Sequence, residues 1–230
     1  YESYGIPMVV TDGTRDVRLN VFNRNINYIY LPGEPLNNRI LKALECVKTK
    51  YVCFAADDDF ISPDFLLESL ECMKIDPSIS TVVGRRYYFF ENNFYEWVPC
   101  DDQATSIANN DEFKRIKEYF ATYFAIFYSP IKTELAREFF EATREFPIEH
   151  ANITELMFSL RVLLEGKIVK IGSFSQAREI PALLTKERLD MSCPYQLILK
   201  NPNLGASMDK IAKNWCINWQ EGMFEKLVVL

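Results

Sequence analysis

A strand, an acidic triplet and a helix start follow one another within residues 51–63 (YVCFAADDDFISP). The first six residues are apolar and rich in β-formers, which predicts a fully buried strand. Ser62 and Pro63 have the residue types of an N-cap and a first helical position, so we expect a helix to begin there. The aspartates between them follow the carboxyl end of the strand, where open α/β sheets bind their ligands. This segment constrains both the fold and the place of a functional site.

The acidic triplet consists of Asp57, Asp58 and Asp59. Adjacent carboxylates repel one another unless they share a cation. Mg²⁺ and Mn²⁺ prefer oxygen ligands, so the triplet predicts a site where such an ion bridges to a phosphorylated substrate. The same residues also fit a solvated acidic loop that merely caps the next helix, and the motif alone leaves both interpretations open.

Strands and helices alternate in the first part of the chain. Predicted strands span residues 7–12, 25–31 and 51–56, and predicted helices span 36–48 and 63–75. This alternation predicts an α/β fold with a mainly parallel sheet flanked by helices. A hairpin of strands 80–90 and 94–98 adds antiparallel character.

The second part of the chain is expected to be mainly helical. Its predicted elements are helices 110–120, 132–145, 153–165 and 205–227 and strands 123–128 and 167–171. Gly166 is expected to be the C-cap of the third of these helices. Trp215 and Trp219 have helical spacing, which favours a core or partner contact.

The composition limits what this chain can do. Its 230 residues, 48% of them hydrophobic, suffice for one sizeable domain. A net charge of −6 without a basic run argues against nucleic acid as a partner. No apolar run reaches about 18 residues, so we expect no membrane span, while peripheral association stays open. Six cysteines without a C-x-x-C pair indicate free thiols and a cytoplasmic chain, at the inner face of a membrane if it associates with one.

Three motifs together resemble family 2 glycosyltransferases with the GT-A fold. Residues 10–14 (VTDGT) are similar to the end of that family's second strand, and 56–67 (ADDDFISPDFLL) to its DxD-type metal loop and following helix. Residues 154–167 resemble its later acidic motif, with Glu155 and Arg161 at matching positions. Three motifs in the family's order are far more specific than any one of them.

The resemblance implies a GT-A, Rossmann-like mixed sheet, mainly parallel and flanked by helices. It implies one domain over 1–230, with a nucleotide-sugar-binding half (1–100), an acceptor and catalytic half (101–180) and a C-terminal helical extension (181–230). The implied reaction moves a sugar from a nucleotide-sugar donor, with UDP-sugars favoured, to a hydroxyl of a glycan or lipid-linked acceptor. Family members of this kind use Mn²⁺ or Mg²⁺, and inverting stereochemistry is expected.

The resemblance also assigns roles to the acidic residues. Asp58 and Asp59 are the expected metal ligands, and Asp57 beside them is expected to contact the nucleotide-sugar. Asp12 is expected to accept a hydrogen bond from the base or ribose. Glu155 is the expected general base, which takes the proton of the acceptor hydroxyl. Its position near a helix start is expected to lower its pKa, and residue 149 is the next candidate.

Basic and aromatic side chains complete the expected site. Lys42, with Arg39 on the same helix, and Arg178, in an expected flexible loop, would meet the donor diphosphate. Tyr87, Tyr88 and Trp97 could stack on an acceptor sugar.

Each assignment has a structural alternative. Asp12 could only form a turn with Gly13, and Lys42 could lie on a solvated helix face. Glu155 could simply favour the helix dipole, and Arg178 could form a surface pair with Glu179. The aromatic side chains could be hairpin packing.

The chain departs from the family pattern at several points. Ala56 replaces the first acid of the metal loop, and Thr11 and Thr154 replace acids of the other two motifs. The family's first strand and helix are not among the elements that we expect in this chain. These departures keep open a second class of function, a non-catalytic GT-A-like module that binds a sugar nucleotide or a partner. A nucleotidyltransferase is a third and weaker hypothesis for the function, because the chain has only eight glycines and no Gly-rich phosphate loop. The single histidine, His150, argues against a His-rich metal site.

Overall fold

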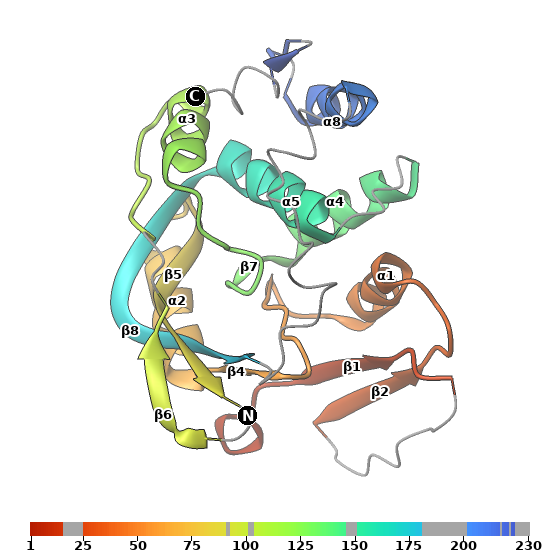
Figure 1. Ribbon diagram of the computed structural model, residues 1–230, viewed down its shortest axis with the longest axis vertical. Helices are drawn as coiled ribbons and strands as arrows, with labels where there is room; N and C mark the ends of the chain where they lie inside the picture. Colours follow the sequence, from red (N-terminus) through yellow and green to blue (C-terminus); the bar gives the residue numbers. More distant parts are fainter. Residues whose placement is uncertain are drawn as a thin grey trace. The chain divides into compact units, whose positions relative to one another are not determined.

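The computed structural model describes residues 1–15, 25–90, 93–100, 104–145, 151–180, 202–216, 218–220 and 222–223. The chain divides into two units. Unit 1 comprises Tyr1–Val52 and Lys132–Pro147, and unit 2 comprises Cys53–Ile131 and Ile148–Leu230. Figure 1 labels the helices and strands of both units.

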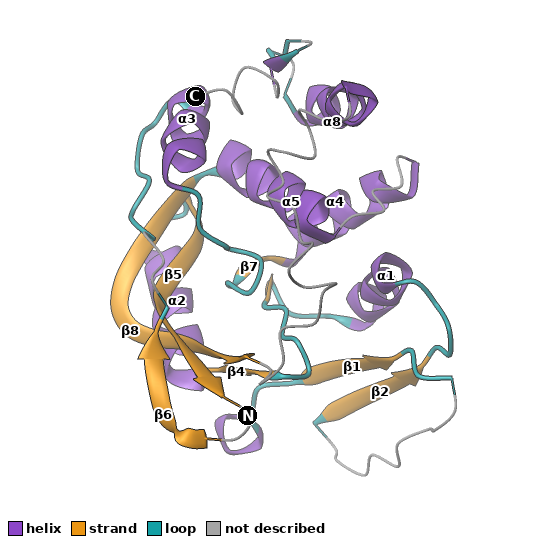
Figure 2. Ribbon diagram, in the orientation of Figure 1, coloured by secondary structure: helices purple, strands orange, loops and turns teal. Residues whose placement is uncertain are grey.

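Unit 1 contains a parallel strand pair and two helices (Figure 2). A 3₁₀ turn (η1, Glu2–Tyr4) precedes β1 (Met8–Asp12), which pairs in parallel with β2 (Ile26–Tyr30). Helix α1 (Leu36–Cys46) packs on β1 and on α4 (Thr133–Glu145), and β3 (Tyr51–Val52) ends the first segment. The predictions of both strands and both helices are confirmed.

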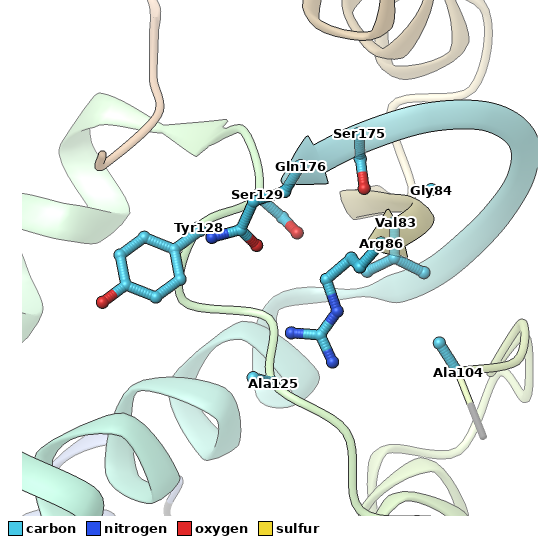
Figure 3. Close-up of a pocket in the computed structure, with 9 residues that line it drawn as sticks. All are labelled: Val83, Gly84, Arg86, Ala104, Ala125, Tyr128, Ser129, Ser175 and Gln176. Carbon is cyan, nitrogen blue, oxygen red and sulfur yellow. The ribbon is translucent and has the colours of Figure 1, made fainter. Parts of the chain in front are cut away.

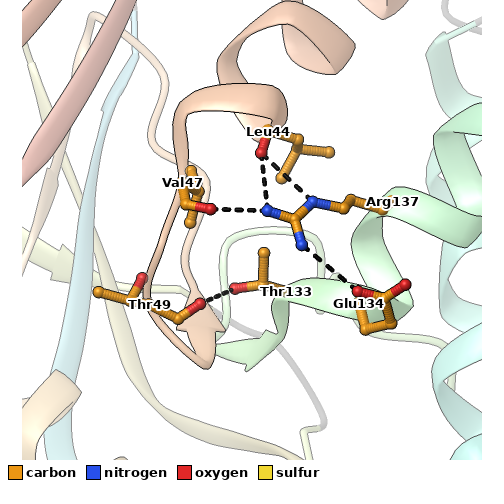
Figure 4. Close-up of polar contacts among 6 residues, drawn as sticks. All are labelled: Leu44, Val47, Thr49, Thr133, Glu134 and Arg137. Atoms are coloured by element: carbon orange, nitrogen blue, oxygen red, sulfur yellow. Dashed lines mark hydrogen bonds and ion pairs between the residues drawn. The ribbon is translucent and has the colours of Figure 1, made fainter.

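The guanidinium of Arg137 on α4 closes the C-terminal end of α1 (Figure 4). It donates hydrogen bonds to the carbonyl oxygens of Leu44, at 3.0 Å, and Val47, at 2.6 Å. The last carbonyls of a helix have no partner within the helix, so a side chain that reaches them stabilises its end. Thr133 Oγ1 donates a hydrogen bond to the carbonyl of Thr49 at 2.8 Å, which ties the segment after α1 to α4.

Arg137→Ala is expected to lower the free energy of unfolding by about 2–3 kcal/mol, because two carbonyl groups lose a charged donor. Urea unfolding measures this change. Arg144→Ala removes the same charge from an exposed position in the last turn of α4 and should cost less than about 1 kcal/mol. Equal losses in the two variants would contradict a capping role for Arg137.

Unit 2 is built on a four-stranded mixed sheet in the order β4-β8-β5-β6. The strands are β4 (Asp59–Ile61), β5 (Ile79–Phe90), β6 (Asn93–Pro99) and β8 (Lys167–Ile180). β8 runs parallel to β5 and antiparallel to β4, and β6 forms an antiparallel hairpin with β5. Figure 1 shows β8 as a long, strongly curved strand. The predicted hairpin is confirmed.

The described part of unit 2 contains four helices, which pack on this sheet or on one another. They are α2 (Pro63–Ile75), α3 (Glu112–Thr122), α5 (Ala151–Glu165) and α8 (Pro202–Trp215), and the short β7 (Ile131–Lys132) leads back to unit 1. α2 packs on β5, and both α3 and α8 pack on α5. Helix α2 has the predicted bounds, because the Ser62 hydroxyl accepts a hydrogen bond from Phe65 N at 3.3 Å and Pro63 follows it.

Helix α5 forms the centre of the core in unit 2. Most of its side chains are buried, with Leu156, Leu160 and Leu163 fully covered, as expected for a helix that is apolar nearly all round. It ends at Glu165, and Gly166 follows at the predicted C-cap position, where its backbone N–H donates to the carbonyl of Val162 at 3.2 Å and its φ is not positive. A Cβ there would collide with the carbonyl oxygen of Ser78, so close packing explains the glycine.

Three predicted strands differ from the structure. The strand expected at 51–56 is limited to β3, with half-buried side chains, because the chain then turns away from a ladder and Phe54 packs on aromatic rings instead. Residues 123–128, all described, form a loop whose apolar side chains fill the core without pairing. Strand β8 continues beyond 171 to Ile180, since β4 and β5 pair with it on both sides.

The C-terminal helix is shorter than predicted. α8 ends at Trp215, and Trp219 lies beyond it. The indole of Trp219, which is 3% exposed, donates a hydrogen bond to Asp209 Oδ1 at 2.8 Å. The chain therefore folds back on α8, and Trp215 and Trp219 do not form one helical stripe. Within the described ranges, no helix combines the length and apolar character that a membrane crossing needs.

Candidate active site

Polar side chains from three strands meet on one face of the sheet in unit 2. The strand register places Asp59 opposite Arg178, and Arg178 opposite Tyr88; two residues away, Gln176 lies opposite Arg86. Side chains at matched or i+2 positions of neighbouring strands share a face. The structure thus brings a residue of the acidic loop next to Arg178, which lies in β8 and not in the flexible loop that we predicted.

Asp59 is the acid of the triplet that lies in a strand, as the first residue of β4. Its Oδ2 accepts a hydrogen bond from Gln176 Nε2 at 2.6 Å. Its Oδ1 is buried and has no hydrogen-bond partner among the described residues. Burial raises the pKa of Asp59, as does the neighbouring Asp58, while Arg178 opposes the change. Asp57 and Asp58 lie in an exposed turn.

Glu155 lies in the second turn of α5 and belongs to the same electrostatic neighbourhood. Burial raises its pKa, and Arg178 and then Arg86 act against that increase. The sequence predicted a lowered pKa near the helix start. The structure corrects this, because α5 begins at Ala151 and the Glu155 carboxyl lies in a largely desolvated place. Burial also raises the pKa of Tyr128 to about 12, with Glu155 as the next cause.

An aromatic cluster positions these groups. The rings of Phe54, Phe127 and Phe158 lie 4.9–5.9 Å apart, centroid to centroid. The cluster joins the segment before the acidic loop to the segment that carries Tyr128 and to α5. Because it is formed by one side chain from each segment, it holds the acidic loop and the helix that carries Glu155 in a fixed relation.

Helix α5 is also tied to α3 by hydrogen bonds. The hydroxyl of Tyr119, a fully buried side chain, lies 2.8 Å from Ser159 Oγ and donates to the carbonyl of Phe124 at 2.7 Å. Ser159 Oγ in turn donates to the carbonyl of Glu155 at 2.8 Å. These contacts fix the loop after α3 against the turn of α5 that carries Glu155.

Arg86 extends from β5 towards the loop after α3 (Figure 3). It lines a small cavity with Tyr128, Ser129 and Gln176, with Ala125 on the facing loop. It also lines a larger cavity of about 440 Å³, together with Tyr88, Gln176 and Arg178. This volume is within the range of small-molecule sites.

The other residues that were predicted to bind the nucleotide-sugar donor lie in unit 1. Asp12 ends β1, and its Oδ1 accepts hydrogen bonds from the backbone N and hydroxyl of Thr14 at 2.9 and 2.6 Å. Tyr28 donates its hydroxyl proton to Oδ2. These hydrogen bonds, with that from the Thr14 hydroxyl first, lower the pKa of Asp12. Its carboxylate thus forms a local turn, and a contact to the nucleotide stays a prediction.

The basic residues of α1 already have partners within unit 1. Lys42 is exposed and pairs with Glu45 at 3.0 Å, which is the arrangement of a solvated helix face. The guanidinium of Arg39 donates to the carbonyls of Thr11 and Glu34 at 3.4 and 3.2 Å. Contacts of either residue with the diphosphate stay predictions.

Trp97 is described by the structure, and the alternative base at 149 is not. Trp97 is 45% exposed and its ring lies 5.4–6.4 Å from those of Tyr87, Phe89 and Phe174, so it packs within the hairpin face. Residues 146–150, which include the alternative base at 149 and His150, lie outside the described residues.

Arg86, Gln176 and Tyr128 are site residues that were not predicted from the sequence. Arg86 could have been found, because Arg85 and Arg86 interrupt an otherwise apolar strand. Side chains alternate between the two faces of a strand, so one of these arginines must lie on each face. Gln176 gave no such signal, since β8 was expected to end before it. Tyr128 was expected in a strand that does not form.

The chain belongs to glycosyl transferase family 2, whose family model matches residues 10–140, more than half of the sequence. The matched segment contains Asp12 and the acidic loop and ends ahead of Glu155. The match confirms the resemblance to this family, while the roles of Asp12 and of the acidic loop stay predictions. No curated protein sequence matches the chain significantly.

Solved structures of S. aureus TarS share the fold. TarS 1–349 gives a TM-score of 0.57 at 13% identity, over 96% of this chain and 60% of that one. For TarS 1–349 in complex with UDP-GlcNAc the TM-score is 0.53 at 13% identity, and the match covers 89% of this chain and 55% of that one. Its complex with UDP gives 0.54 at 12% identity, over 96% and 60%. The predicted GT-A fold is confirmed, and this chain spans 60% of TarS 1–349 or less.

Proposed function

We propose that this chain carries out metal-dependent, inverting transfer of a sugar from a nucleotide-sugar donor to an acceptor hydroxyl. One observation carries the proposal. The acidic loop, Arg178 and Glu155 share one electrostatic neighbourhood in unit 2, so a group for the leaving diphosphate and a group for the attacking hydroxyl lie close together. Membership of glycosyl transferase family 2 supports the same reaction class.

The carboxylates of the acidic loop fit a divalent cation, Mn²⁺ or Mg²⁺. Asp58 is exposed and Asp59 has a buried oxygen without a hydrogen-bond partner, so each offers an oxygen to an ion. No group of three or more His, Cys, Asp and Glu side chains in the described part of the chain is placed to hold a metal. A site here would therefore use one or two carboxylates, with water and diphosphate oxygens completing the shell, as is usual for Mg²⁺. A bound ion supplies positive charge where the departing diphosphate develops negative charge.

Glu155 takes the proton of the acceptor hydroxyl as the hydroxyl oxygen attacks the anomeric carbon of the donor sugar. A carboxylate whose pKa is raised by burial is a stronger proton acceptor than an exposed one, which suits this role. Arg178, on the same sheet face as Asp59, offers its guanidinium to the diphosphate. Asp57 is proposed to contact the nucleotide-sugar from the exposed turn.

The choice of donor follows from the TarS complexes. Those structures hold UDP-GlcNAc and UDP, which supports a UDP-sugar as the donor of this chain. A glycan or a lipid-linked compound is the proposed acceptor. The described cysteines are all free, which supports a reducing, cytoplasmic location.

A donor panel tests the proposal. The full chain is incubated with Mn²⁺ and with UDP-, GDP-, CMP- and TDP-sugars, and released nucleotide is measured. Slow release from a UDP-sugar, abolished by EDTA and restored by Mn²⁺, is the expected result. Binding of a donor with no turnover under any condition would favour the non-catalytic module, for which the substitutions Ala56 and Thr154 in the family motifs already argue.

A further inference from the structure

Gln176 holds the carboxylate of Asp59 from a neighbouring strand. It lies on β8, its side chain is 3% exposed, and its Nε2 donates a hydrogen bond to Asp59 Oδ2 at 2.6 Å. The strand register pairs Gln176 with Ile61, so Asp59, two residues earlier on β4, is its diagonal neighbour on the same face. Diagonal neighbours lie about 7–8 Å apart, a span that only a long side chain crosses. The length of the glutamine therefore suits this contact.

The backbone around this contact is held on several sides. β4 pairs with β8 over its whole length, and Ser62 N donates a hydrogen bond to the carbonyl oxygen of Ser175 at 2.8 Å just before α2 begins. On its other side β8 pairs with β5. A buried side chain on a strand that is paired at both edges has little freedom to change its conformation. Gln176 therefore restricts the orientation of the Asp59 carboxylate.

This contact uses only one of the two carboxylate oxygens. Asp59 Oδ1 is buried and makes no hydrogen bond with any described residue. A buried polar atom without a partner calls for an explanation, and a site for an ion is one such explanation. The amide of Gln176 is uncharged, so it fixes Oδ2 without neutralising the carboxylate. Asp59 thus keeps its negative charge for a cation at Oδ1.

We propose that Gln176 is a positioning residue for the metal site, which orients Asp59 so that its second oxygen contacts a divalent cation. This inference rests on the proposed metal-dependent function. Residues that hydrogen-bond to a metal ligand fix the orientation of that ligand. Mg²⁺ requires a nearly ideal octahedral arrangement of oxygens, whereas Ca²⁺ tolerates variable geometry. A fixed carboxylate therefore favours Mg²⁺ over Ca²⁺ as well as strengthening metal binding.

The test measures binding of Mn²⁺ to the full chain, with and without UDP, by the electron paramagnetic resonance signal of free Mn²⁺. Protein-free UDP is the blank, and Mg²⁺ and Ca²⁺ are measured by competition with Mn²⁺. Wild type is compared with Gln176→Met, which keeps the length of the side chain but has no donor. It is also compared with Gln176→Asn, which keeps the amide but is too short to cross the diagonal.

Ser175→Ala is the matched control. It removes a buried hydrogen bond from the neighbouring position of β8, where the hydroxyl of Ser175 donates to the carbonyl of Arg85 at 3.0 Å. That hydrogen bond does not involve the acidic loop, so its loss tests the effect of weakening β8 alone. Far-UV circular dichroism checks that each variant is folded, and Gln176→Asn carries the prediction if Gln176→Met does not fold.

Wild type and Ser175→Ala are expected to bind Mn²⁺ equally. Both Gln176 variants should bind Mn²⁺ and Mg²⁺ about 10- to 100-fold more weakly, the usual effect of losing a hydrogen bond to a metal ligand. Their loss of affinity for Ca²⁺ should be smaller, so the preference for Mg²⁺ over Ca²⁺ should fall.

Three results would overturn the proposal. Mn²⁺ affinities of both Gln176 variants equal to that of wild type would refute the positioning role, while the proposed metal site would stand. Equal losses for Mg²⁺ and Ca²⁺ would show that Gln176 only supports the local structure. Absence of Mn²⁺ binding by wild type, with and without UDP, would refute the metal-dependent function and this inference with it.

Discussion

Glu155→Gln is expected to lower sugar transfer by about 10²- to 10⁴-fold, the usual contribution of a positioned general base. Donor affinity should stay near that of wild type, because Glu155 is proposed to act on the acceptor hydroxyl. Steady-state transfer and donor binding measure the two effects. Glu71→Gln, on the exposed side of α2, is the matched control and should leave both unchanged.

The pH dependence separates a catalytic from a structural effect of this substitution. Glu155 must be ionised to act as a base, so kcat/KM of wild type should rise with pH through the raised pKa of its carboxyl. Because the folded-state pKa lies above the unfolded one, ionisation of Glu155 costs stability as pH rises through that interval. The glutamine variant should lack both effects and should be no less stable than wild type at neutral pH. Normal transfer by this variant would show that the base lies elsewhere.

Asp58→Asn is expected to abolish metal-dependent binding of the nucleotide-sugar. Loss of a charged ligand should weaken donor binding in the presence of Mn²⁺ by at least about 3 kcal/mol, more than a hundredfold in affinity. Calorimetry of UDP binding with Mn²⁺ and with EDTA measures the metal-dependent part. Asp64→Asn, in the exposed first turn of α2, removes an equal charge close by and should keep that part intact.

The outcome that would contradict the metal assignment is a variant that binds UDP and Mn²⁺ like wild type. The acidic loop would then be the solvated cap that its sequence also allowed. A loss of metal-independent binding in both aspartate variants would instead indicate a general electrostatic effect.

Local chemistry explains which elements could be predicted. Helix α2 has its predicted bounds because Ser62 and Pro63 define its start within a few residues of sequence. The loop at 123–128 and the length of β8 could not be predicted, because both depend on distant neighbours. Phe127 packs in an aromatic cluster from three segments, and β8 is extended by strands on both of its sides.

The same distinction applies to the candidate site. The acidic triplet, Arg178 and Glu155 were identified from residue types and family resemblance, and the structure brings Asp58, Asp59, Arg178 and Glu155 together. Arg86 was missed because only the register of β5 against β8 brings it to this face. The raised pKa of Glu155 was missed because the sequence does not show how much of α5 is buried.

The acidic loop is proposed to hold a divalent cation, which in turn holds the donor diphosphate. Crystals of the protein soaked with Mn²⁺ and UDP test it most directly, because manganese gives an anomalous signal that locates the ion. We expect an anomalous peak in contact with a carboxylate oxygen of Asp58 and with diphosphate oxygens. Bound UDP with no manganese beside Asp58 or Asp59 would contradict it.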